Sequence, residues 1–145
     1  MDIKTVDIFK INNYSLQEVI EFVAYNMIKQ NQQAAVFTRF GDVSSCHLRF
    51  NGKKCALGWC IPDDKYSPDM EENSEVSTFM DEYKIHPSND VTNLLTSLQT
   101  LHDEQRPYYW DNSHTGLPAI AEAFELDVDR VQAVIQQAIK DRANA

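Results

Sequence analysis

The sequence predicts a mainly α-helical protein of the α+β class, in which about five helices pack with one small β-hairpin near residues 46-61. Five segments carry apolar residues at three- and four-residue spacing, the period of a helix with one buried face. One further segment alternates apolar and polar residues and meets an Asn-Gly pair, which is typical of a hairpin. With 145 residues, 43% of them hydrophobic, we expect a single domain covering residues 1-145.

The first helix is expected to run from Ser15 to about Gln30. Ser15, followed three positions later by Glu18, forms a capping box. A stripe of apolar residues is predicted to face the core: Leu16, Val19, Ile20, Val23 and Met27. The next apolar stretch, Ala34 to Phe40, is too short to assign and fits either a strand or an extension of the helix.

The hairpin is predicted around a type I′ turn at Asn51-Gly52. Residues 46-50 alternate, and a second apolar run extends from Cys55 to Ile61, so these two segments are the expected strands. The pairs expected across the strands are Phe50 with Lys53, Leu48 with Cys55, and Cys46 with Leu57.

Four more helices are expected after the hairpin. A short one carries Val76, Phe79, Met80 and Tyr83 and ends before Pro87. A longer one is capped by Ser88, Asn89 or Asp90, carries leucines at positions 94, 95, 98 and 101, and ends at Pro107. Two helices close the chain, one from Leu117 to Phe124 and one capped by Asp127.

The chain is acidic, with 22 Asp and Glu against 13 Lys and Arg and a net charge of −9. Such a surface repels phosphate backbones, so direct nucleic-acid binding is not expected, and a basic or nucleic-acid-binding protein is the expected partner. The alternative is that the acidity only keeps the protein soluble. The predicted contact residues are the acids of the segment from residue 63 to 73: Asp63, Asp64, Asp69, Glu71 and Glu72.

Three consecutive aromatic residues, Tyr108, Tyr109 and Trp110, form a second predicted contact surface. They lie in a stretch without helical or alternating period, and these residue types dominate interface hot spots. The alternative is a loop that folds back onto the core.

No metal, cofactor or catalytic residue is predicted. Cys46, Cys55 and Cys60 lack the spacing of a zinc site and are expected to be buried, reduced thiols. His102 and Asp103 suggest a metal-dependent hydrolase, but consecutive residues on a helix diverge by about 100°, so we expect them to point apart and the His102 ring to be half-buried and hydrogen-bonded. A small hydrolase built on this pair is kept as an alternative function.

The residues from Leu117 to Ile135 have the layout of a DNA-binding helix-turn-helix, which gives a second alternative, a transcription regulator. Glu125 occupies the turn position where that motif usually has glycine, and Asp127 and Asp129 would face phosphates. Only three side chains on the second helix are suited to base edges: Arg130, Gln132 and Gln136. Compact packing of two helices is therefore favoured over DNA recognition.

The segment from Lys54 to Glu71, Lys-Cys-Ala-Leu-Gly-Trp-Cys-Ile-Pro-Asp-Asp-Lys-Tyr-Ser-Pro-Asp-Met-Glu, resembles a family of small uncharacterised phage and prophage proteins. The resemblance takes in the first helix and the Leu-Gln-x-Leu-His-Asp stretch around His102. The family has no known activity, so the resemblance implies a mobile-element setting and supplies no functional residue.

Together these observations give the hypothesis of a phage-encoded, non-catalytic, acidic factor that inhibits or redirects a host protein, with a nucleic-acid-binding defence protein as one such target. The longest apolar runs fall far short of the roughly 20 residues that cross a bilayer, and the N-terminus has no basic region before an apolar stretch. We therefore expect the protein to act in the cytoplasm of a bacterial host, away from the membrane.

Overall fold

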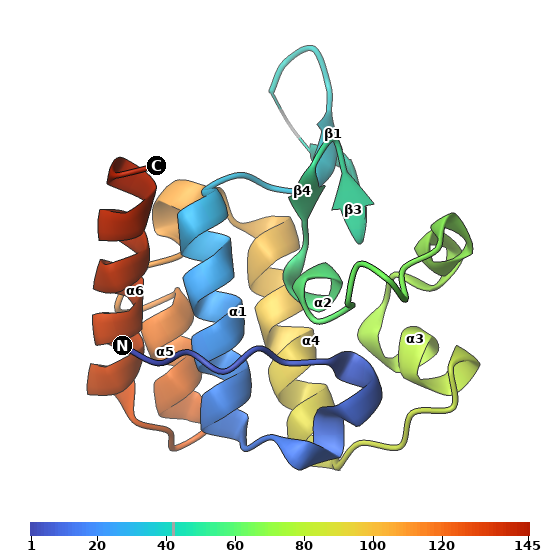
Figure 1. Cartoon of the computed structure of the whole chain (residues 1–145). Helices are drawn as coiled ribbons and strands as arrows, with labels where there is room; N and C mark the ends of the chain where they lie inside the picture. Colours follow the sequence, from blue (N-terminus) through green and yellow to red (C-terminus); the bar gives the residue numbers. More distant parts are fainter. Residues whose placement is uncertain (42) are drawn as a thin grey trace.

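The computed structural model describes residues 1–41 and 43–145 and confirms a mainly helical α+β fold. Four helices stand side by side as a bundle: α1 (Leu16–Gln30), α4 (Asn89–Glu104), α5 (Leu117–Ala123) and α6 (Val128–Ala143). Helix α1 packs against both α4 and α6, and α5 packs against α4 and α6 (Figure 1). The apolar stripes predicted for these helices form the core, although Leu16 at the start of α1 is only partly buried.

The bundle helices begin where their capping residues place them. The Ser15 hydroxyl accepts from the Glu18 amide, and the Glu18 carboxylate accepts from the Ser15 amide, so the predicted capping box is confirmed. Ser88 caps α4 and Asp127 caps α6 in the same way. Because each cap satisfies an amide that lacks a partner within its own helix, local sequence defines these starts.

Shorter elements cover the α4 side of the bundle. They are the 3-10 helices η1 (Ile8–Asn13) and η2 (Pro68–Asn73) and the α-helices α2 (Ala56–Trp59) and α3 (Val76–Glu82). Helices α2 and α3 both pack against α4, and η2 packs against α3. In the described residues, none of the helices combines the length and the apolar character needed to span a membrane.

The chain forms two small antiparallel hairpins, whereas the sequence predicts one. Strand β1 (Ala35–Phe37) pairs with β2 (Val43–Cys46), and β3 (Arg49–Phe50) pairs with β4 (Lys53–Lys54). The second hairpin has the predicted turn, because Asn51 and Gly52 both have positive φ and Phe50 pairs with Lys53. The stretch beginning at Ala34, which fits either a strand or a helix by sequence, is therefore resolved as strand β1.

The predicted second strand from Cys55 to Ile61 is wrong, because this segment turns into helix α2 after two paired residues. The run is apolar almost throughout, and a short continuous apolar run suits a buried helix as well as a buried strand. The expected Leu48–Cys55 neighbours do meet, since the Cys55 amide donates to the Leu48 carbonyl at 3.0 Å. Cys46, however, pairs with Ala35 instead of Leu57.

Candidate functional site

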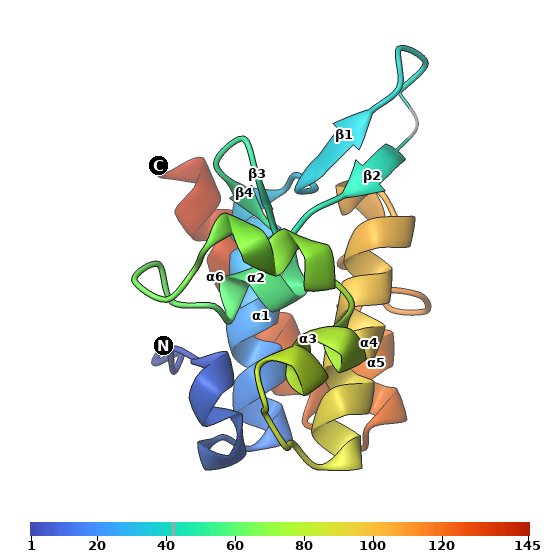
Figure 2. The same ribbon diagram turned by 90° about the vertical axis from the view of Figure 1, so that its right-hand side faces the viewer.

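The two hairpins carry most of the large hydrophobic side chains that are exposed in the described part of the chain. Of the eight large hydrophobic side chains that are exposed among the described residues, five belong to the hairpins and define what we call the hairpin surface: Val36, Phe37, Phe40, Val43 and Phe50. Phe40 is 77% exposed and Phe37 is 48% exposed. Strands β1 and β2 project beyond the helical bundle (Figure 2), so the bundle leaves this surface uncovered. Clusters of exposed apolar side chains mark interaction sites.

Basic and aromatic groups flank these apolar side chains. The Arg39 guanidinium lies 4.8 Å from the centre of the Phe40 ring, a cation–π contact. The His47 ring stacks on Phe50 with 5.2 Å between ring centres. Arginine and aromatic residues are enriched at protein–protein interfaces. The side chains around the hairpin surface are therefore of the types that interfaces contain.

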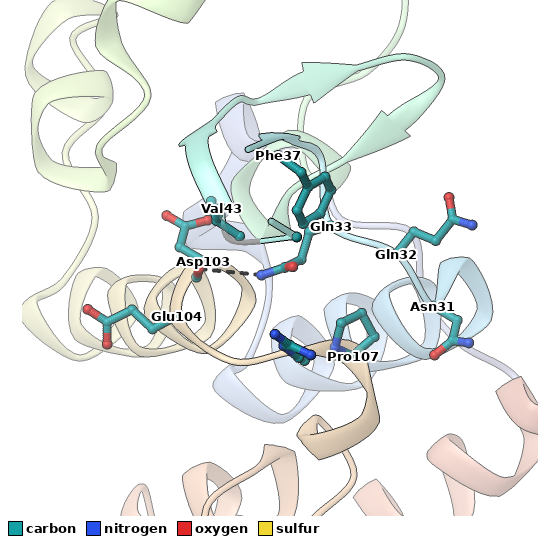
Figure 3. A pocket seen from close by; sticks show the side chains of 10 residues that line it. Asn31, Gln32, Gln33, Phe37, Val43, Asp103, Glu104 and Pro107 are labelled. Carbon is teal, nitrogen blue, oxygen red and sulfur yellow. Dashed lines mark hydrogen bonds between the residues drawn. The ribbon is translucent and has the colours of Figure 1, made fainter. Parts of the chain in front are cut away.

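A hollow of about 410 Å³ lies at the base of the first hairpin, between β1, β2 and the C-terminal end of α4. Figure 3 shows the Phe37 ring on one side of this hollow, Pro107 on the other, and the Gln33 amide between them. Asp103, Glu104 and Arg106 supply charged groups at its rim. The hollow therefore combines apolar walls with polar groups of both signs.

The hollow continues towards the aromatic segment. A neighbouring hollow of about 490 Å³ shares Asn31 and Pro107 with the first and is lined by Tyr108 and Tyr109. Both tyrosines are exposed, as their predicted contact role requires. Trp110 is 0% exposed and donates its indole N–H to the Gln105 carbonyl at 3.0 Å. Trp110 is therefore a core residue and lies out of reach of a partner, as the fold-back alternative expects.

A buried histidine anchors the first hairpin to the bundle. His102 is 0% exposed, and its Nε2 accepts from the backbone amide of Ala34, the residue before β1, at 3.1 Å. Its Nδ1 therefore carries the proton and donates to Asp103 Oδ1 at 2.7 Å. The ring also stacks on Trp110, with 5.6 Å between ring centres. One side chain thus joins the strand, the helix and the aromatic segment.

A buried glutamine completes this anchor. Gln33 Nε2 donates to the carbonyl of His102, in the last turn of α4, at 2.8 Å. It also donates at 3.2 Å to the carbonyl of Gln105, which accepts from the Trp110 indole as well. Asp103 Oδ1 also accepts from Gln99 Nε2 at 2.9 Å. Because the two residues before β1, Gln33 and Ala34, are both bonded to the C-terminal end of α4, the start of the hairpin is fixed relative to the bundle.

The prediction that His102 and Asp103 point apart is wrong. The Asp103 side chain turns back towards α4, where the His102 ring and the Gln99 amide both donate to it. Their backbone directions diverge as helix geometry requires, but a short side chain can still return to its neighbour. The His102 ring is hydrogen-bonded as predicted, and it is fully rather than half buried.

Cys46, His102 and Asp103 bring three ligand-type atoms within 4.8 Å of one another, so we tested the site against a bound cation. A cation would need the Nδ1 lone pair, which moves the ring proton to Nε2. That proton would then point at the N–H of Ala34, so that two hydrogen-bond donors would face each other without an acceptor. These residues do not fit a metal ion, and the geometry gives no support to a hydrolase built on His102.

The three thiols are poor nucleophiles. Burial, with a contribution from the negative charge of Asp103, raises the pKa of Cys46 to about 12. Burial alone dominates at the other two: it raises the pKa of Cys55 to about 12 and raises that of Cys60 as well. Since the thiolate is the reactive form, these groups are inert near neutral pH.

We expect Ellman's reagent at pH 8 to react with the folded protein at least about 1,000-fold more slowly than with the protein in urea, because a pKa of about 12 leaves far less thiolate than the ordinary value of about 8.5. Raising the pH from 8 to 10 should speed the reaction of half-buried Cys46 about tenfold per unit, because its pKa still lies above this range. A Cys46 rate that equals that of the unfolded chain at pH 8 would contradict this assignment.

The predicted acidic contact residues divide into two groups. Glu71 serves the fold: its carboxylate accepts from the amides of Leu48 at 2.8 Å and Arg49 at 3.1 Å, and from the Tyr66 hydroxyl. Asp63 is paired with Lys54 and Arg49, and Lys54 holds the pKa of that carboxyl below its ordinary value. The remaining three are exposed: Asp64, Asp69 and Glu72.

Helices α5 and α6 pack against each other across a short turn, but this pair does not suit DNA. Glu125 has φ of 57°, the left-handed conformation that favours glycine at this turn. Arg130, one of the three side chains suited to base edges, instead bonds Glu21 of α1 at 2.8 Å. Asp127 and Asp129 stand at the start of α6, so the surface offered to a phosphate backbone is acidic.

Charge is unevenly distributed along the chain. Residues 24–62, which include both hairpins, contain five Lys and Arg and one Asp, a net charge of +4 in a chain of net charge −9. Arg49 and Lys54 are paired with Asp63, whereas Arg39 and Lys53, which also lie on the hairpins, make no ion pair among the described residues. The segment that forms the hairpins is thus basic within an acidic chain.

Comparison with family models, with curated proteins and with solved structures finds no match to this chain. The functional reading therefore rests on the geometry alone. Sequence reasoning missed the hairpin surface because Ala34 to Phe40 could not be assigned. The sequence did carry a signal for this hairpin, because Gly41 indicates a turn and apolar residues lie on both sides of it. They are Phe37 and Phe40 before the turn and Val43 after it.

Proposed function

We propose that this protein is a non-catalytic protein-binding factor and that its partner contacts the hairpin surface. The observation that carries the proposal is the set of five exposed apolar side chains on two hairpins at one end of the bundle. Leaving such side chains in water forgoes about 25 cal/mol of stabilisation for each Å² of apolar surface that burial would remove. A partner that covers them recovers this free energy as affinity.

The anchored base supports this proposal. Binding costs less when the surface is already ordered, because less conformational freedom is lost. The hydrogen bonds from Ala34 to His102 and from Gln33 to the end of α4 hold the start of β1 before any partner arrives. The first hairpin is therefore suited to act as a preformed contact element.

The proposed contact is the hairpin surface and not the acidic segment from residue 63 to 73. A surface that imitates a nucleic-acid backbone needs many free negative charges, and Asp63 and Glu71 are already engaged within the fold. Inhibition of a host protein by a phage-encoded factor fits a binding protein of this kind, and in that case it would act by covering a surface of its target. The hairpin surface, flanked by the exposed tyrosines, is the better-formed contact.

The test is site-specific photo-crosslinking in extract of the cells that carry the gene. We expect a photoreactive benzoyl-phenylalanine in place of Phe40 to give a discrete adduct with one protein, and the same residue in place of Thr96, exposed on α4, to give none. Replacing Phe37 with serine in the crosslinking protein should abolish the adduct. Because Phe37 and Phe40 are exposed, these changes should leave thermal unfolding unaltered.

The purified target then allows an affinity measurement. The double variant Phe37→Ser/Phe40→Ser should bind about 100-fold more weakly than the natural chain, as expected for loss of two aromatic anchors. Equal crosslinking from positions 40 and 96, or unchanged affinity of the double variant, would overturn the proposal.

A further inference from the structure

The first hairpin leaves one edge of β1 without a strand neighbour. Each sheet in the described residues contains two strands, and β1 is paired only with β2. A hollow of about 240 Å³ lies along β1, lined by its residues, by the preceding glutamines Gln32 and Gln33, and by Phe50, Asn51 and Lys53 of the second hairpin. The hollow therefore lies between β1 and the turn of the second hairpin.

An unpaired strand edge presents backbone N–H and C=O groups that a second chain can bind. Proteins usually protect such edges with charged residues or proline, or by covering them. Strand β1 has no proline or charged residue: it consists of Ala35, Val36 and Phe37, the last two are exposed, and its pairing with β2 shifts register between Val36 and Phe37. This edge is therefore open to an added strand.

The chemistry along the hollow favours an acidic occupant. Lys53 is the one charged side chain among its described lining residues, and Arg39 follows β1 on the same hairpin. Neither Lys53 nor Arg39 makes an ion pair within the described residues, so both charges are available. Phe37 and Phe50 supply apolar walls beside them.

We propose that an extended segment of the partner protein, alternating apolar and acidic residues, pairs with the free edge of β1 as a third strand. The inference rests on the proposed function and names the chemistry of the partner. An added strand lies about 4.8 Å from its neighbour, and the hollow is lined by β1 itself, where such a strand would run. Alternate side chains reach Phe37 and Phe50, and the carboxylates meet Lys53 and Arg39.

The experiment is a selection from a library of random ten-residue peptides on the full chain. Peptides that also bind the Phe37→Ser/Phe50→Ser variant are removed. We expect the surviving peptides to alternate apolar residues with Asp or Glu. Lys53→Glu should weaken a selected peptide at least tenfold, whereas Lys10→Glu, the same charge change on η1, should leave its affinity unaltered.

Backbone pairing is tested by N-methylation of a selected peptide. Only alternate amides of a strand face its neighbour. Methylating the even-numbered amides of the peptide and methylating the odd-numbered ones should therefore differ: one set should abolish binding and the other should leave the affinity unaltered. Selected peptides that are basic or helical, or that tolerate both phases, would overturn the strand proposal and leave the hairpin surface as the binding site. The proposed function fails together with the strand proposal if every peptide also binds the Phe37→Ser/Phe50→Ser variant and the photoreactive residue at position 40 gives no adduct.

Discussion

Replacing His102 with alanine should lower the free energy of unfolding by about 3 to 5 kcal/mol. The ring is 0% exposed, so its removal leaves a cavity beside Trp110. The Ala34 amide loses its acceptor and becomes a buried donor without a partner. Both effects act at the base of the first hairpin.

The loss is measured by urea denaturation, and its location by hydrogen exchange. The Ala34 amide should be protected in the natural chain and exchange far faster in His102→Ala, while amides in the middle of α6 keep their protection relative to global unfolding. His102→Gln is the matched control, because its side-chain carbonyl can accept from Ala34 and should restore about half of the loss. A loss below about 1 kcal/mol, with Ala34 still protected, would show that His102 does not anchor the hairpin.

Gly58→Ala should cost about 3 kcal/mol or more, or prevent folding. A Cβ on Gly58 would lie 2.1 Å from the Leu48 carbonyl oxygen and 3.0 Å from the Leu48 carbonyl carbon. Both are backbone atoms, which cannot relieve the clash by changing rotamer as a side chain can. The Leu48 backbone is held by the Glu71 carboxylate at its amide and by the Cys55 amide at its carbonyl.

Gly52→Ala separates this steric effect from backbone conformation. Gly52 has φ of 78° in the hairpin turn, but an added Cβ meets open space, so only the left-handed conformation opposes it. We expect a loss of about 1 kcal/mol for Gly52→Ala by thermal and urea denaturation. Equal losses at the two positions would contradict the close approach of α2 to Leu48.

The elements with strong local signals could be predicted from the sequence. Ser15 with Glu18, Ser88 and Asp127 each cap a helix whose apolar face follows at three- and four-residue spacing. The Asn51-Gly52 turn is equally local, because type I′ geometry demands two residues with positive φ. Segments of two to four residues were not predictable in this way. Strand β1 has too few residues to show a period, and the apolar run that contains α2 is equally typical of a buried strand.

Length, acidity, helix starts, the predominance of helix and one hairpin turn were thus determined by the sequence itself, since each depends on composition or on residues within a few positions of one another. The burial of Trp110, the meeting of His102 with Asp103, and the engagement of Glu71 with Leu48 were decided by the tertiary structure. The hairpin surface belongs to the second group. Its base depends on a hydrogen bond between Ala34 and His102, 68 positions apart. Only the packing of the whole chain brings those two residues together and leaves the apolar side chains of the hairpin outside the core.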